Sequence, residues 1–400
     1  MSYVSYVLAG TIFNLPNRWL DAVVRIVIIT GLMTFNTLAL TYIERKVIAR
    51  VQQRLGPTRT GPAGVLQPVA DALKLLTKED VRPRLADRWV FELAPFLVFV
   101  PVFLAFITLP FAADWGIRFL DLGLFYILAV MSVNIVGWVM AGWGSDNKYA
   151  LLGGVRAVAQ MISYEVPLIL AALAVVMVAG TLDLRTIIEQ QDHIPNIVIQ
   201  PLPFVFFLIA MLAELNRNPF DIPVAESEVV GGVTVEYSGI RWSFFQLAEY
   251  TALFILSVLA ADLFLGGYAW PWSRIPWGGA FLGHAWFQIV QLILTFIKTS
   301  LFILFAMWVR ATLPRLRIDQ LMAYAWKVLI PLALAQLFVD GWILVYSPPA
   351  WGLWIALCSW ALVGILGYVS YTAVQRMARR RPREERVAAA QAAVAAARSA

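Results

Sequence analysis

Long apolar runs dominate this chain and alternate with shorter polar segments. Nine such runs occupy residues 22–42, 93–112, 121–141, 158–180, 202–216, 247–267, 286–308, 327–346 and 351–373. An α-helix rises about 1.5 Å per residue, so about 20 residues cross a hydrocarbon core of about 30 Å. The pattern therefore predicts an all-α fold, a polytopic transmembrane helix bundle of about nine spans, in which the fifth span is short.

Charge along the chain predicts how these spans are oriented. Alternate loops hold 25 Lys and Arg residues on one side and four on the other. Because cytoplasmic loops carry the excess of Lys and Arg, the N-terminus should lie outside and the C-terminus in the cytoplasm. The net charge of +6 then needs no nucleic acid to explain it. Four segments follow: an external N-terminal segment at 1–21, eight spans at 22–346, an additional C-terminal helix at 347–375, and a basic Ala/Arg-rich tail at 376–400.

Composition narrows the class of protein and the chemistry available to it. Hydrophobic residues make up 60% and charged residues 14% of the chain, against roughly 25% charged in a soluble domain. Cys358 is the one cysteine, and the two histidines, His193 and His284, are far apart. A thiolate-ligated Fe–S cluster or a Cys/His zinc site cannot be built from this chain alone, and no Gly-rich nucleotide motif is present. We expect no cofactor in this chain and any redox centre elsewhere.

The polar segment between Glu44 and Glu92 predicts a surface element. Gly and Pro residues first break the chain into turns, and apolar residues then recur at helical spacing through Leu73 and Leu76. This pattern favours an amphipathic helix lying along the inner membrane surface. The basic residues could bind anionic lipid. The acids among them, including Asp71 and Glu79, favour instead a docking surface or the lined entrance to a cavity.

The segment from Glu214 to Glu249 forms a long acidic cytoplasmic loop between two spans. It holds Glu214, Asp221, Glu226, Glu228, Glu236 and Glu249 against only Arg217 and Arg241. Acids gathered beside a membrane disfavour one another's ionised form and can exchange protons. The alternative is a solvated linker, but Pro219, Pro223 and paired glycines favour a shaped crossing.

Two of the charged residues inside the apolar runs stand out. Glu165 lies in the fourth run, and Lys298 lies near the middle of the seventh. A charge at this depth is costly unless it is paired or faces water. Lys298 could extend its amine to the membrane surface, but its central position predicts an acid or a watered cavity beside it.

Six motifs in order carry a resemblance to a known family. They are ERK, QQRLGP, GPAGVLQPVADALKLLTKE, YALLGGVRAVAQMISYEVPL, AELNRNPFDIPVAESE with EYSG, and RATLPRLRIDQLM. Over roughly residues 20–345 the chain resembles the H subunit, a membrane subunit, of proton-pumping NADH-quinone oxidoreductase, the bacterial complex I. The resemblance implies a multi-pass protein of a prokaryotic plasma membrane, with a quinone chamber in the eight-span segment and a quinone, ubiquinone or menaquinone, as substrate.

The resemblance also implies partners and residue roles. NADH, FMN and Fe–S clusters would belong to partner subunits, and the chain would contact membrane lipid, other membrane-arm subunits and the hydrophilic subunits of the quinone site. The quinone chamber and subunit interface would include Glu44, Arg45, Arg54, Asp71, Lys74, Lys78, Glu79, Arg217, Asp221, Glu226 and Glu228. The proton path would include Glu165, Glu214, Glu236, Glu249 and Lys298.

Two departures from the family pattern and three alternatives stay open. Val224 stands where the family has an acid after Pro223, and the helix at 351–373 would be a ninth span beyond the usual eight. The alternative nearest to this family is the homologous membrane subunit of a hydrogenase or of another dehydrogenase complex. A stand-alone proton-coupled transporter should show inverted repeats, and a passive anchor would not bury Glu165 and Lys298.

Overall fold

The structure is a computed structural model that describes residues 18–269, 284–346, 351–368 and 372. Every regular element in these residues is helical, and they contain no β-strand. The all-α class predicted from the apolar runs is confirmed.

The helices follow the predicted runs closely. Their bounds are α2 Arg18–Val51, η1 Pro62–Gly64, α3 Gln67–Thr77, α4 Arg88–Phe106, α5 Gly123–Ser132, α6 Asn134–Gly144, α7 Lys148–Ala179, α8 Leu184–Gln190, α9 Asn196–Ile199, α10 Pro201–Glu214, α11 Glu226–Val229, η2 Gly232–Thr234, α12 Gly239–Phe264, α14 His284–Thr312, α15 Ile318–Tyr324, η4 Ala325–Leu329 and α16 Ile330–Tyr346. A further helix spans Trp351–Tyr368. Each of the nine predicted runs therefore coincides with a helix.

Seven helical segments in the described residues are long and apolar enough to cross a membrane. They are Arg88–Phe106, Gly123–Gly144, Lys148–Ala179, Gly239–Phe264, Phe287–Thr312, Ile318–Tyr346 and Trp351–Tyr368. The fifth predicted run is α10, which has 14 residues. At about 1.5 Å per residue it covers about 21 Å, less than a full hydrocarbon core. Its end inside the bundle places Glu214 and the acidic loop among packed helices.

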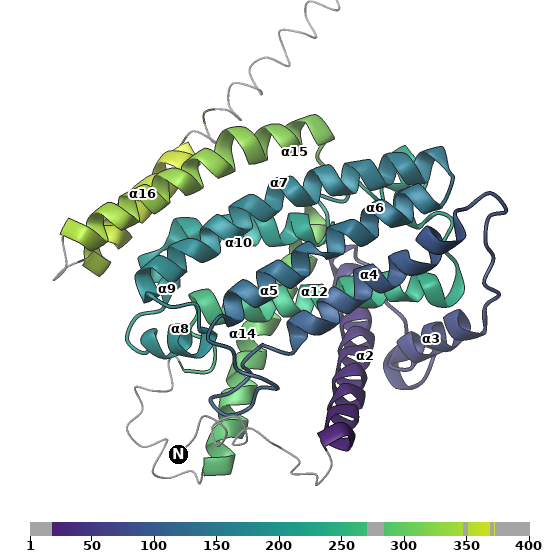
Figure 1. The fold of residues 1–400 in the computed structure, drawn as a ribbon, viewed down its shortest axis with the longest axis horizontal. Coiled ribbons are helices and arrows are strands. Elements are labelled where there is room, and N and C mark those ends of the chain that lie inside the picture. The colour runs from purple at the N-terminus through teal and green to yellow at the C-terminus, as the bar shows by residue number, and fades with distance from the viewer. Residues whose placement is uncertain (1–17, 270–283, 347–350, 369–371, 373–400) are drawn as a thin grey trace, which may run out of the picture.

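Helix α12 forms the centre of the bundle. Of the residues in its most apolar 18-residue segment, 83% are buried, and the helix contacts α2, α4, α10 and α14. Figure 1 shows α4, α6 and α7 side by side, with α2 and α14 inclined steeply against them. A polar residue on α12 is therefore enclosed by several helices.

Small residues set the close approach of α6 and α7. A Cβ atom on Gly142 would lie 2.8 Å from the Ala150 carbonyl oxygen and 3.0 Å from the Gly154 Cα atom. Because these distances are shorter than ordinary contacts, the two helices can pack this tightly only with glycine at this position.

A helix, α3, forms in the stretch for which a surface helix was predicted. Its apolar residues are open in this chain, with Val69 41%, Leu73 58% and Leu76 61% exposed. The helix is tied to the bundle at its end, where the Ser238 hydroxyl accepts a hydrogen bond from the Val81 amide at 3.1 Å. Its apolar face is thus available to lipid or to a partner.

The predicted ninth helix, Trp351–Tyr368, packs against the start of α10. The Leu202 amide donates to the Ser359 hydroxyl at 3.3 Å, and the Trp360 indole donates to the Val198 carbonyl at 3.2 Å. The basic tail predicted at 376–400 lies outside the described residues.

Candidate functional site

Arg217, in the loop after α10, is the centre of a buried charge network. Its side chain is 2% exposed. The guanidinium lies 2.5 Å from a Glu44 carboxylate oxygen and 2.9 Å from a Glu249 oxygen, and it stacks 4.7 Å from the centre of the Tyr250 ring. Burial alone would lower the pKa of Arg217, but Glu249 and Glu44 raise it overall. The network therefore ties the acidic loop to α2 and α12.

A second cation completes the pairing of Glu44. Arg310, near the end of α14, donates to the other carboxylate oxygen of Glu44. The Glu44 side chain is 5% exposed, so one buried acid faces two arginines. Glu44, Arg217 and Glu249 were predicted from the sequence as separate members of the site, whereas Arg310 and Tyr250 were missed. The sequence signal that could have identified Arg310 is the motif RATLPRLRIDQLM, which begins with this arginine just after the seventh run.

Asp221 pairs with another arginine of the same motif. Arg315 approaches its carboxylate at 2.9 Å, and the Leu316 amide donates to the Pro219 carbonyl at 3.1 Å. Burial raises the pKa of the Asp221 carboxyl, and Arg315 and Arg310 offset this only in part. The segment after α14 thus packs against the acidic loop. The Asp221 carboxyl in this loop binds a proton more readily than an ordinary aspartate.

Gln160 on α7 fixes the path of the acidic loop. Its amide nitrogen donates to the carbonyls of Ala213 and Phe220, each at 2.8 Å, and to the Asn216 side chain at 3.0 Å. Gln160 is 1% exposed. One buried amide therefore joins three points of the turn that carries Arg217, a role that was not predicted from the sequence.

The other acids of the loop lie apart from the Arg217 network. Glu228 is about half exposed and pairs with Arg156 of α7 at 2.6 Å, while Glu236 accepts a hydrogen bond from the Asn147 side chain at 2.6 Å. The Glu226 side chain lies outside the described residues. Val224 packs against the apolar core. The loop acids are thus distributed over several different partners.

Glu165 and Glu214 share a small cavity inside the bundle. It is lined by Leu128, Met131, Ser132, Glu165, Leu168, Ile169, Glu214 and Leu256 and has a volume of ≈ 20 Å³. That volume holds about one water molecule. The Ser132 hydroxyl donates to Glu165, and the two acids are close enough to interact electrostatically. Two acids from α7 and α10 therefore meet in an apolar surrounding.

Lys298 has the acidic neighbour that its central position predicted. The Lys298 amine and Asp262 of α12 interact electrostatically, and both residues are buried. The acid itself was not identified from the sequence, because Asp262 lies near the end of an apolar run far from the acidic loop.

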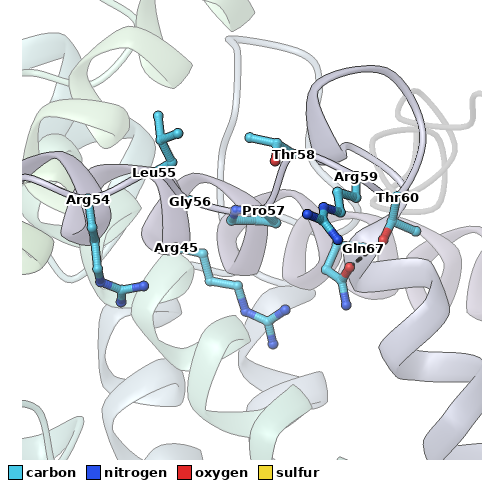
Figure 2. A pocket seen from close by; sticks show the side chains of 9 residues that line it. All are labelled: Arg45, Arg54, Leu55, Gly56, Pro57, Thr58, Arg59, Thr60 and Gln67. Atoms are coloured by element: carbon cyan, nitrogen blue, oxygen red, sulfur yellow. Dashed lines mark hydrogen bonds between the residues drawn. The ribbon is translucent and has the colours of Figure 1, made fainter.

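The residues predicted for the first polar loop divide into two groups. Arg45 and Arg54, together with Arg59, which was not predicted, line an open hollow of ≈ 570 Å³ at the end of α2 (Figure 2). Arg45 also pairs with Asp71 at 2.5 Å. Lys74, Lys78 and Glu79 are exposed on α3 and just after it, and they do not line the hollow.

Within the described residues, no group of three or more His, Cys, Asp or Glu side chains is placed to hold a metal ion. The acids of the site interact instead with arginines, Lys298, side-chain amides, the Ser132 hydroxyl or one another. The arrangement can hold and move protons and can respond to nearby charge.

Comparison with known proteins identifies the family. A model of the NADH dehydrogenase family matches residues 24–341. The chain is 46% identical to the NADH-quinone oxidoreductase H subunit of Dehalococcoides mccartyi (strain CBDB1) over 330 residues, 82% of this chain and 89% of the relative. It is 45% identical to the protein of the same name from Brevibacillus brevis over 329 residues, 82% of this chain and 93% of the relative. These matches cover the acidic loop and the helices around it, and the chain belongs to the H-subunit family of NADH-quinone oxidoreductase, as a membrane subunit of that enzyme complex.

Proposed function

We propose that this chain forms much of the quinone-binding chamber of its complex and couples quinone reduction to proton translocation through buried acids. The observation that carries the proposal is the cavity shared by Glu165 and Glu214. Ionisable residues inside membrane segments are costly, and they mark proton pathways in pumps and transporters. Glu214 lies three residues before Arg217 in the chain, so the same short segment contributes to the cavity and to the buried charge network.

Electrostatics supply the coupling in this proposal. Quinone reduction consumes protons and adds negative charge in a chamber of low dielectric constant, where charges interact much more strongly than in water. The acids Asp221, Glu226 and Glu228, with Arg217, lie below the quinone head group and respond by changing protonation or position. The disturbance then passes to the proton path of Glu165, Glu214, Glu236, Glu249 and Lys298.

The first polar loop supplies the quinone entrance and the contacts with hydrophilic subunits. Support comes from the arginine-lined hollow with Arg45 and Arg54, and from the exposed apolar face and charges of α3. Quinone is the substrate in this proposal, and NADH, FMN and Fe–S clusters are held by partner subunits. Other membrane-arm subunits and lipid cover the remaining apolar surface of the bundle.

Asp221→Asn and Glu228→Gln should leave an assembled complex while lowering both quinone reduction and proton pumping. Burial raises the folded-state pKa of Asp221, so its ionised form opposes folding at pH values above the unfolded pKa of about 4. A neutral amide removes that opposition. A carboxyl that supplies protons to a limiting step contributes about 10²- to 10⁴-fold, and the remaining acids reduce the loss from one change. Subunit content, NADH-driven quinone reduction and dye-detected acidification of membrane vesicles measure the three quantities.

The matched control for this test is Asp319→Asn, whose side chain is 70% exposed and pairs with Arg317. It should leave all three measurements unchanged. Asp221 and Glu228 pair with different arginines, so we expect the losses of the two single variants to multiply in the double variant. A double variant with wild-type quinone reduction and pumping would show that the acidic loop is only a linker.

We also propose that, in the plasma membrane of a prokaryotic cell, the N-terminus lies outside and the basic tail lies in the cytoplasm. Translocation of the arginine block between Arg376 and Arg386 is disfavoured. In a Cys358→Ser background, Ala390→Cys should resist an impermeant thiol reagent in intact cells and react after permeabilisation. His193→Cys, at an exposed position between α8 and α9, is the control that should react in intact cells. Ready labelling of Ala390→Cys from outside would reverse the assignment of the tail.

A further inference from the structure

Asp262 is a fully buried acid in the last turn of α12. It is 0% exposed, and within the described part of the chain neither of its carboxylate oxygens has a hydrogen-bond partner. Buried polar groups are normally hydrogen-bonded. An acid placed in this way calls for a charge partner or for a proton of its own.

Lys298 of α14 supplies the charge partner. Its amine donates to the Leu265 carbonyl at 2.7 Å and to the Gly267 carbonyl at 2.5 Å. The same turn holds the acid, because a Cβ atom on Gly267 would lie 2.5 Å from an Asp262 carboxylate oxygen. The absence of a side chain at Gly267, which has a φ of +37°, leaves room for the carboxyl beside the carbonyls that bind Lys298.

The elements around the pair fix its backbone and limit the other charges near it. The Gln191 side chain donates to the Asp262 carbonyl at 2.8 Å, and the Asn196 side chain donates to the Leu263 carbonyl at 2.9 Å. Arg185 and Glu189 of α8 interact electrostatically with Tyr268, which also interacts with Asp262. Among the residues that the structure describes, Lys298 is the charged residue that interacts electrostatically with the Asp262 carboxyl.

We propose that Asp262 and Lys298 form a proton-exchanging pair, a further site of the proton path in the last turn of α12, C-terminal to Glu249 on the same helix. The proposal rests on the coupling function proposed above. The two groups are not hydrogen-bonded to each other in this structure, so the exchange follows rotation of one of the side chains: an N–H bond of the Lys298 ammonium breaks, an O–H bond forms on the Asp262 carboxylate, and no electrons are transferred. The charged pair and the neutral pair have the same net charge, so the exchange leaves the net charge of the site unchanged. A proton gained or lost by the path shifts the balance between them.

The test compares three variants of the intact complex in membrane vesicles. Asp262→Asn removes the proton acceptor, and Lys298→Arg keeps a positive charge that does not release its proton at any pH a protein experiences. The control is Asp340→Asn, a fully buried acid on α16 whose oxygens accept from the Gln200 and Gln336 amides at 3.1 and 2.6 Å. The oxygens of those amides have no partner among the described residues, so rotated amides can accept from the new asparagine.

Asp262→Asn and Lys298→Arg should each keep quinone reduction and lose proton translocation per electron. A positioned proton carrier contributes about 10²- to 10⁴-fold to a transfer step, so the translocation that passes through the pair is removed. The infrared difference spectrum between oxidised and quinol-reduced complex should lose a carboxylic-acid carbonyl band in Asp262→Asn. Asp340→Asn should retain the band and the wild-type ratio of protons to electrons.

Wild-type translocation in Lys298→Arg would assign the pair a structural role and overturn the proposal. An unchanged proton-to-electron ratio and an unchanged infrared band in Asp262→Asn would do the same, as would a loss of assembled complex in both variants. Glu165→Gln and Glu214→Gln, measured in parallel, separate the two proposals. If they lower the ratio while Asp262→Asn does not, only the role of the pair fails; if none of them changes the ratio, the coupling function fails as well.

Discussion

Arg217→Ala should remove most of the assembled complex from the membrane. The substitution leaves Glu249 without its arginine and Glu44 with Arg310 alone, inside a network in which Arg217 is 2% exposed. Breaking a buried ion pair by removing one partner costs about 3–5 kcal/mol. Because domains are stable by only about 5–15 kcal/mol, subunit content in membranes and the midpoint of thermal unfolding should both fall strongly.

The control for this result is another arginine with an acidic partner. Arg317 is 76% exposed and pairs with Asp319 at 2.9 Å, and exposed pairs contribute about 0–1 kcal/mol. Arg317→Ala should therefore leave subunit content near wild type. Adding Glu249→Gln to Arg217→Ala should restore part of the loss, because it removes one uncompensated buried charge. Normal accumulation of Arg217→Ala would mean that the network does not support the fold.

The apolar runs predicted the helices because their signal is local. A run of about 20 apolar residues defines a membrane helix without knowledge of its neighbours, and the described helices coincide with all nine runs. The depth to which α10 crosses the bundle was harder to predict, since its apolar run, 202–216, is short and contains Glu214. The structure shows that this short helix ends inside the bundle, where its last acid meets Glu165.

The partners of the acids could not be predicted in the same way. Glu44 and Arg310 are 266 residues apart, and Gln160 reaches a turn more than 50 residues away. Such contacts depend on how the helices pack, and one sequence contains no record of that packing. Asp262 illustrates the limit, since the position of Lys298 predicted an acid nearby but did not indicate which one. Motif resemblance found the acids of the site and Arg217, but not Arg310 and Arg315, which pair with Glu44 and Asp221.

Glu165→Gln and Glu214→Gln should each abolish most proton translocation while the complex still assembles. Each carboxyl in this cavity can take up a proton and pass it on to its neighbour. Glutamine has nearly the same shape and cannot exchange that proton. The expected slowing of the transfer step is about 10²- to 10⁴-fold. Dye-detected acidification of vesicles, divided by the NADH oxidised, measures the effect.

The double variant tests whether the two acids act as one site. Groups that share a proton are strongly non-additive, so Glu165→Gln with Glu214→Gln should be no worse than the more severe single variant. Ser132→Ala, which removes the hydroxyl that donates to Glu165, should lower translocation less than either acid variant, because both acids remain. Asp121→Asn, at an exposed position before α5, should have no effect. Losses that multiply in the double variant would mean that the acids act in separate steps, and wild-type translocation in it would exclude this cavity from the proton path.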